Sequence, residues 1–185
     1  MDRRGFFKAG VDMVYQGVAR ELRNRVGGRT TQGIRPPYAL GEADFLQACT
    51  RCGQCIDACP HGVIFLLADE TPALDLLHKG CRLCQDWPCV AACEPGALRL
   101  PETGEDLEPG LPRLARATIN TAACLPYSGP ECGACAASCP VPGALVWHGT
   151  KPGIDADKCC GCGLCREDCI VEPKAVGIRG MRSED

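Results

Sequence analysis

The chain has 185 residues, of which 17 are cysteines and only 5% are aromatic, and its formal charge at pH 7 is −3. Because few large side chains remain to fill a core, groups bound by cysteine must contribute much of the folding energy. The longest apolar run, residues 62–68, is far shorter than the roughly 20 residues that cross a bilayer. The odd cysteine count argues against a fully paired disulfide framework, and the lack of a basic excess argues against nucleic acid as a partner.

The first 35 residues differ from the rest in charge and pattern. They hold eight Lys or Arg against three acidic residues, whereas residues 36–185 hold twelve against twenty. Apolar residues recur there at helical spacing: Phe7, Val11, Val14, Val18, Leu22 and Val26. Residues 6–26 are therefore predicted to form an amphipathic helix, which packs on the protein's own body, on a partner subunit or peripherally on a membrane. We divide the chain into a basic helix and linker, residues 1–35, and a cysteine-rich domain, residues 36–185.

The segment Arg3–Lys8, which reads RRGFFK, resembles the signature of twin-arginine export. A working export signal needs a continuous apolar region afterwards and a small-residue cleavage site. Asp12, Gln16 and Arg20 interrupt that region, and no such cleavage site follows. We therefore expect a bacterial or archaeal protein of the cytoplasm or the membrane surface, with periplasmic export as the alternative.

Sixteen of the seventeen cysteines fall into four motifs of four. Motif one is Cys49, Cys52, Cys55 and Cys59; motif two is Cys81, Cys84, Cys89 and Cys93; motif three is Cys124, Cys132, Cys135 and Cys139; motif four is Cys159, Cys162, Cys165 and Cys169. Motifs one and four have the C-x2-C-x2-C-x3-C spacing of bacterial ferredoxins, in which the fourth cysteine ligates the other cluster of a pair. The spacing predicts that the sixteen cysteines are the iron ligands of four [4Fe–4S] clusters.

Other uses of these cysteines fit the spacing poorly. Structural zinc sites use C-x2-C pairs separated by a dozen or more residues, whereas motifs one and four each place four cysteines within eleven residues. A disulfide scaffold gives no reason for C-x3-C to end all four motifs. Cys160 is left over, and we interpret it as a bystander because Cys159 already supplies the regular spacing.

Short β-prone runs surround the motifs. They follow the motifs at residues 63–66, 97–100, 144–147 and 175–179, and they precede motifs three and four at residues 113–120 and 153–155. Strand, cysteine loop, short helix and strand make half of a ferredoxin fold, so four halves make two two-cluster modules. The predicted class is α+β, with small strands and short helices around the clusters. Residues 101–112 are rich in acids, Pro and Gly, and are predicted to form an exposed loop.

No pattern indicates a substrate site. The glycines around Cys162 belong to a cysteine loop and lack the rest of a nucleotide-binding fingerprint. The histidines are scattered: His61, His78 and His148. Arg51, Arg82 and Arg166 lie inside cysteine loops, where they contact cluster sulfur, partner carboxylates or solvent. The chain is therefore predicted not to be an enzyme by itself.

Three segments carry a family resemblance. Residues 81–93 read CRLCQDWPCVAAC, residues 124–129 read CLPYSG, and residues 169–176 read CIVEPKAV. They are similar to the C-x2-C-x3-P-C-x3-C, C-L-x-Y-x-G and C-x-x-E-x-P-A-I patterns of the NapG/MauM type of ferredoxin. These proteins are iron–sulfur subunits found beside periplasmic nitrate reductase and methylamine dehydrogenase, and the resemblance covers residues 45–180.

The resemblance implies an electron-transfer subunit with four [4Fe–4S] clusters, related to the iron–sulfur subunits of molybdopterin oxidoreductases. Such a subunit relays electrons between a quinol-linked membrane partner and a terminal oxidoreductase. The alternative is an iron–sulfur accessory or maturation protein whose clusters are structural.

The resemblance also implies nested modules, with motif one (residues 49–60) beside motif four (159–173) and motif two (81–95) beside motif three (124–140). In that arrangement Cys169 joins the first three cysteines of motif one, and Cys59 joins those of motif four. Cys139 joins motif two and Cys93 joins motif three. A sequential pairing, one with two and three with four, stays open.

Overall fold

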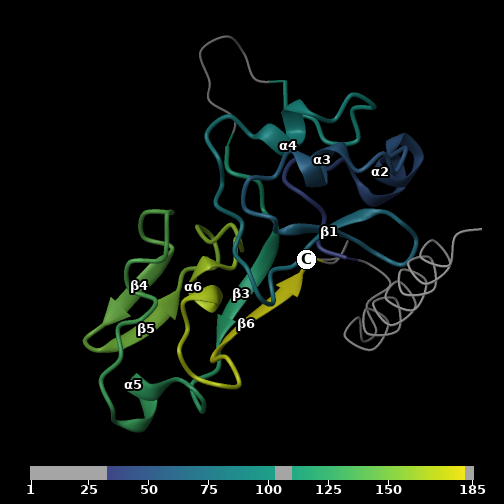
Figure 1. Cartoon of the computed structure of the whole chain (residues 1–185). Coiled ribbons are helices and arrows are strands. Elements are labelled where there is room, and N and C mark those ends of the chain that lie inside the picture. The colour runs from purple at the N-terminus through teal and green to yellow at the C-terminus, as the bar shows by residue number, and fades with distance from the viewer. Residues whose placement is uncertain (1–32, 103–109, 182–185) are drawn as a thin grey trace, which may run out of the picture. The chain divides into compact units, whose positions relative to one another are not determined.

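The computed structural model describes residues 33–102 and 110–181 (Figure 1). The helix predicted at residues 6–26 and most of the predicted loop at 101–112 lie outside these ranges. The cysteine-rich unit begins at Gly33, slightly before the expected boundary at residue 36. The Ile34 carbonyl accepts a hydrogen bond from the Leu74 amide at 2.7 Å, and Arg35 pairs with Glu42 at 2.6 Å. These contacts make Ile34 and Arg35 part of the folded unit.

The described elements are short helices and strands that pair in twos. The helices are α2 (Glu42–Ala48), α3 (Gln54–Asp57), α4 (Pro88–Ala91), α5 (Leu125–Ser128) and α6 (Leu164–Glu167). The strands are β1 (Ile64–Leu66), β2 (Pro72–Leu74), β3 (Ala115–Ile119), β4 (Leu145–His148), β5 (Lys151–Ile154) and β6 (Val176–Gly180). This composition agrees with the predicted α+β class. Within the described part of the chain, no helix has the length and apolarity to span a bilayer.

One arrangement occurs twice along the chain. In residues 33–102 the antiparallel hairpin β1–β2 lies between motifs one and two, and the Ala39–Leu98 bridge joins the segments that flank them. In residues 110–181 the hairpin β4–β5 lies between motifs three and four, and β3 pairs with β6 around them (Figure 1). Each half therefore encloses two consecutive motifs between paired flanking segments, which are joined by a single bridge in the first half and by the strands β3 and β6 in the second.

Most predicted strands form. Residues 63–66 contain β1, residues 113–120 contain β3, and the runs at 144–147 and 175–179 largely coincide with β4 and β6. The run at 97–100 makes only the bridge to Ala39. Strand β2 was not predicted because it has three residues and begins with Pro72, which cannot donate to a ladder.

A buried cluster connects the two halves. Leu76 from the first half and Leu114 and Leu164 from the second belong to it, all less than a tenth exposed. Five cysteines also belong to this buried cluster: Cys55, Cys81, Cys89, Cys160 and Cys162. The core thus combines five cysteine thiols with aliphatic side chains and two aromatic ones, Phe45 and Trp87.

Candidate metal centres

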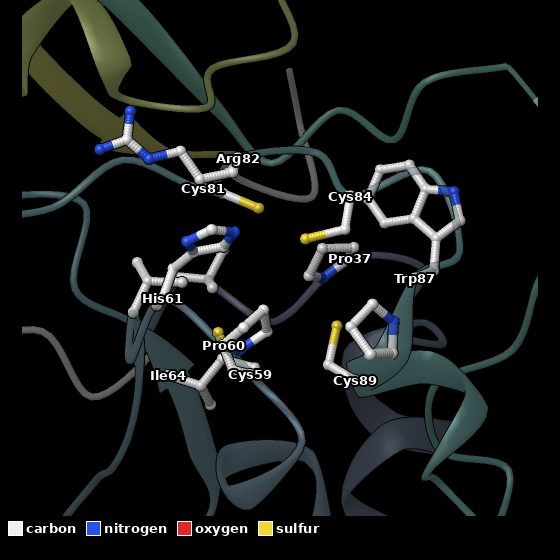
Figure 2. A pocket seen from close by; sticks show the side chains of 13 residues that line it. Pro37, Cys59, Pro60, His61, Ile64, Cys81, Arg82, Cys84, Trp87 and Cys89 are labelled. Carbon is white, nitrogen blue, oxygen red and sulfur yellow. The ribbon is translucent and has the colours of Figure 1, made fainter.

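The first half contains a hollow lined by four thiols, which point toward one another (Figure 2). They are Cys59 from motif one and Cys81, Cys84 and Cys89 from motif two. The remaining walls are mainly apolar and include Pro37, Ile64, Leu74 and Trp87. The hollow has about 340 Å³ of empty space, with open solvent at its mouth included. We call these four cysteines site B.

A corresponding hollow lies in the second half. Five cysteines line it: Cys139 from motif three, Cys159, Cys162 and Cys165 from motif four, and Cys160, which lies outside the four motifs. Ala117, Val141 and Ala144 line it as well, so its walls are again apolar. We call the four motif cysteines, Cys139, Cys159, Cys162 and Cys165, site C.

The other eight cysteines form two further groups, which their electrostatic interactions identify. Burial, with contributions from the nearby thiolates of Cys93, Cys49 and Cys52, raises the pKa of the Cys55 thiol to about 11. Burial also raises the pKa of Cys135, and the thiolates of Cys124, Cys169 and Cys132 contribute. We call the first group (Cys49, Cys52, Cys55 and Cys93) site A and the second (Cys124, Cys132, Cys135 and Cys169) site D.

This grouping is sequential, and it differs from the nested pairing that the resemblance implied. Nesting requires Cys169 beside motif one and Cys93 beside motif three, whereas the structure places Cys93 with motif one and Cys169 with motif three. The hairpins explain the difference, because β1–β2 returns the chain so that motif two meets motif one, and β4–β5 does the same for motifs three and four. In this structure the nested arrangement is therefore wrong.

Short helices distribute the thiols of each motif between two sites. Helices α3, α4 and α6 carry the third cysteine of their motifs, which are Cys55, Cys89 and Cys165. The fourth cysteine comes one turn later, after the helix has ended, and contributes to the neighbouring site of the same half. This distribution of the cysteines of one motif over two sites is the one that the ferredoxin spacing predicts.

The folded protein makes these thiols hard to ionise. Burial, with smaller contributions from neighbouring thiolates, raises the pKa of Cys81 to about 11 and that of Cys89 to about 12. Burial likewise raises the pKa of Cys165 to about 12. A cationic iron–sulfur core reverses this preference for the protonated thiol, because the metal charge favours the thiolate form of its ligands. The donor set therefore fits the group that the sequence predicts.

A single metal ion fits the donors less well. In residues 33–102 and 110–181, no three His, Cys, Asp or Glu side chains converge as one ion would require. Four thiols spaced around a hollow instead suit the separate corners of a cubane.

The loop arginines have partners within the protein. Arg51 donates to the Asp69 carbonyl at 3.1 Å, Arg82 pairs with Glu167 at 3.0 Å, and Arg166 Nε donates to the Leu77 carbonyl at 2.9 Å. The sequence placed these arginines in the cysteine loops but could not identify their partners. Each arginine ties its cysteine loop to a segment distant in sequence.

The structure also shows the surroundings of two histidines, Trp87 and the unassigned Cys160. His61 is exposed, and its ring lies at the hollow of site B (Figure 2). Trp87 packs edge-on against Tyr38 with 4.9 Å between ring centroids and also lines site B. His78 lies 2.9 Å from Asp75. Cys160 is buried and lines the hollow of site C, although it remains outside the sixteen predicted ligands.

Comparison with known proteins adds two kinds of match. The model of the 4Fe-4S binding domain (Fer4) matches residues 46–65, which hold motif one. The methylamine utilization ferredoxin-type protein MauM of Methylobacillus flagellatus is 35% identical over 178 residues, which cover 85% of this chain and 72% of that protein. The ferredoxin-type protein NapG of Escherichia coli is 32% identical over 181 residues, or 88% and 77% of the two chains. Ferredoxin-type protein NapF of the same organism is 32% identical over 153 residues, or 77% and 84%.

Proposed function

Because this chain belongs to the family of ferredoxin-type proteins that includes MauM and NapG, we propose that it relays electrons through four [4Fe–4S] clusters. Members of this family carry electrons and do not transform a substrate of their own. The observation that supports four clusters is the gathering of sixteen cysteines into sites A, B, C and D. In this proposal the chain is composed of two ferredoxin-like modules, each with two clusters.

The proposed ligands are the four cysteines of each site. A bound [4Fe–4S] cluster supplies a centre that accepts and releases one electron at a time. The chain contributes the thiols, the apolar walls and hydrogen bonds to sulfur, such as that from the Leu98 amide to Cys93 Sγ at 3.3 Å. Hydrogen bonds to ligand sulfur and burial are the means by which a protein sets cluster potential.

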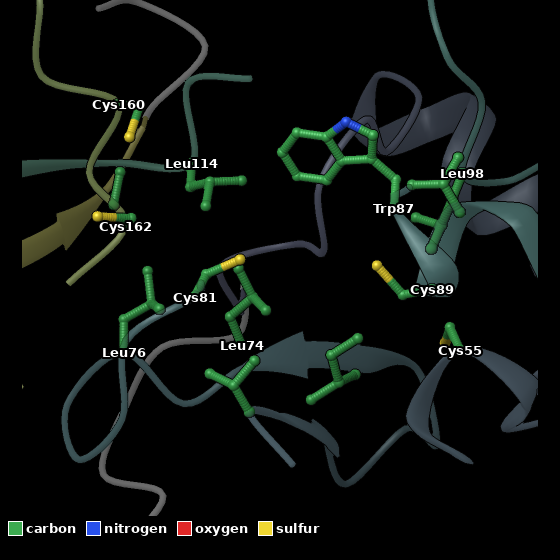
Figure 3. Packing of buried hydrophobic residues seen from close by; sticks show 14 of the residues in the cluster. Cys55, Leu74, Leu76, Cys81, Trp87, Cys89, Leu98, Leu114, Cys160 and Cys162 are labelled. Carbon is green, nitrogen blue, oxygen red and sulfur yellow. The ribbon is translucent and has the colours of Figure 1, made fainter. Parts of the chain in front are cut away.

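Contacts between neighbouring sites give their order. The Cys55 thiolate of site A raises the pKa of Cys89 in site B, and the Cys135 thiolate of site D raises the pKa of Cys165 in site C. Between them, the Cys81 amide of site B donates to the Cys162 carbonyl of site C at 2.8 Å. Figure 3 shows the row from Cys160 and Cys162 past Cys81 to Cys89 and Cys55. We infer one series, A–B–C–D, in which electrons enter at one end and leave at the other.

Metal analysis tests the cluster number. Protein purified without oxygen should contain about sixteen irons and about sixteen acid-labile sulfides per chain, four of each per cluster. Reversible reduction by one electron per cluster, with turnover between two added redox proteins, should accompany that content. About eight irons would contradict two of the four sites, and zinc in place of iron would refute the proposal. Clusters that do not cycle would favour an accessory protein with structural clusters.

The proposed partners are a quinol-linked membrane subunit and a terminal oxidoreductase. One relative is named a methylamine utilization ferredoxin-type protein, and another is named ferredoxin-type protein NapG. A relay of electrons needs two docking partners, one donor and one acceptor. We further propose that the protein works at the membrane surface, where the basic, amphipathic residues 6–26 attach it to its complex.

Removing residues 1–27 should separate assembly from cluster binding. All sixteen proposed ligands follow residue 48, so the shortened protein should keep its iron but lose its association with the native complex. The measurement is iron per chain together with co-purification from membranes. As a matched pair, Val14→Gln with Val18→Gln alters the apolar stripe, whereas Gln16→Ala leaves it intact. Full-yield co-purification of the shortened protein would contradict attachment through this segment.

A further inference from the structure

Two cysteine loops from different halves touch at the middle of the series. The Cys81 amide of the first half donates to the Cys162 carbonyl of the second half at 2.8 Å, and within the second half the Leu114 amide donates to the neighbouring Cys160 carbonyl at 2.8 Å. Gly80 permits the close approach, since a Cβ there would lie 2.5 Å from the Leu164 side chain and 2.8 Å from its Cα. We call the contact of residues 77–82 with residues 160–167 the B–C seam.

Glu167 fastens this seam with both carboxylate oxygens. Its Oε2 accepts a hydrogen bond from the Gly80 amide at 2.8 Å, and its Oε1 accepts one from the Arg82 guanidinium at 3.0 Å. The Glu167 side chain is 26% exposed, so bulk water screens these charge-assisted bonds only in part. Arg166, the residue before it, reaches across the same seam to the Leu77 carbonyl.

The B–C seam bears on the distance between the clusters of sites B and C, on which electron transfer between them depends. Gly80 and Arg82 flank Cys81 of site B, and Glu167 lies on the same short helix as Cys165 of site C. The Glu167 bonds therefore hold the loop of one site directly against the helix of the other. Since the rate of electron tunnelling and the magnetic coupling between reduced clusters both fall steeply with distance, a loosened seam weakens both.

We propose that Glu167 is a positioning residue that sets the separation of the clusters in sites B and C, and so the rate at which an electron crosses between the two halves. This inference rests on the proposed function, because it requires clusters in both sites. Nothing in the cysteine spacing indicates it: the residue is one of three acids near motif four, and only the fold brings it to Gly80.

The test uses the full-length, cluster-loaded protein and Glu167→Ala. We expect iron and sulfide content to be unchanged, while the spin coupling between reduced inner clusters weakens and electron equilibration after rapid one-electron injection slows several-fold. Glu167→Gln should restore part of both quantities, because its amide oxygen can still accept one of the two hydrogen bonds. Electron paramagnetic resonance reads the coupling directly, whether or not a partner enzyme is present.

A charge-matched control separates positioning from simple loss of an anion. Glu172 is exposed and makes no hydrogen bond or ion pair within residues 33–102 and 110–181, so Glu172→Ala removes the same charge near motif four without touching the seam. Coupling and crossing rate in Glu167→Ala equal to those of the control would overturn the proposal. Loss of iron in both the Ala and Gln variants would also overturn it and make Glu167 a structural residue. An iron-free wild-type protein would instead refute the proposed function itself.

Discussion

Replacing Cys55 and Cys93 together by alanine should destroy one cluster, whereas replacing Cys55 and Cys169 together should damage two. Cys55 and Cys93 belong to the same site A, in which the charge of one thiolate raises the pKa of the other thiol. Cys169 belongs to site D, at the other end of the series. The first variant should therefore retain about twelve irons per chain, and the second should have altered clusters at both ends.

The two variants form a crossed pair, since the nested arrangement predicts the opposite outcome for each. Each removes two thiols and shares Cys55→Ala, so general loss of stability affects both alike. Iron and sulfide analysis combined with paramagnetic resonance counts the intact clusters and detects three-iron remnants. Three intact clusters in the Cys55–Cys169 variant and two in the Cys55–Cys93 variant would contradict the sequential sites.

Spacing predicts the ligands better than it predicts their pairing. Three cysteines of one motif are held together by the loop itself, so the spacing alone is enough to group Cys49, Cys52 and Cys55. The destination of the fourth depends on which motif lies beside it, and that is decided by strand pairing. The register of β3 with β6, in which Ala115 faces Gly180, joins residues 65 positions apart and leaves no mark in the cysteine spacing.

Contacts between loops could not be predicted from the sequence either, because they join residues that share no local pattern. Arg35 bonds to Glu42 and Thr71, and Glu167 bonds to Gly80 and Arg82, yet no local periodicity relates any of these residues. Strand β3 was predictable because its alternation of buried and exposed residues is visible along the chain. Sequence reasoning therefore recovered elements with a local pattern and missed the contacts that join them.

Gly161→Ala should disrupt site C. A Cβ at this position would lie 1.9 Å from the Ala115 carbonyl oxygen and 2.4 Å from its carbon, and both atoms belong to the backbone of β3. The clash is relieved only if the loop of motif four moves away from β3. That movement breaks the hydrogen bond from the Leu114 amide to the Cys160 carbonyl and displaces the neighbouring Cys162. We expect about four irons fewer per chain and a melting temperature lower by roughly 10 °C or more, measured without oxygen.

Backbone strain alone does not account for so large a loss. Gly161 has a φ of 72°, and Arg51, at the matching position of motif one, adopts 61° with a full side chain. The matched control is Gly149→Ala in the β4–β5 turn, where φ is 63° and no atom lies within 4 Å of the added Cβ. That variant should keep its iron and lose about 1–2 kcal/mol, the cost of a left-handed conformation for an L-residue. If Gly161→Ala keeps as much iron and melts as high as Gly149→Ala, the loop of motif four does not depend on its contact with β3, and the placement of Cys162 must have another cause.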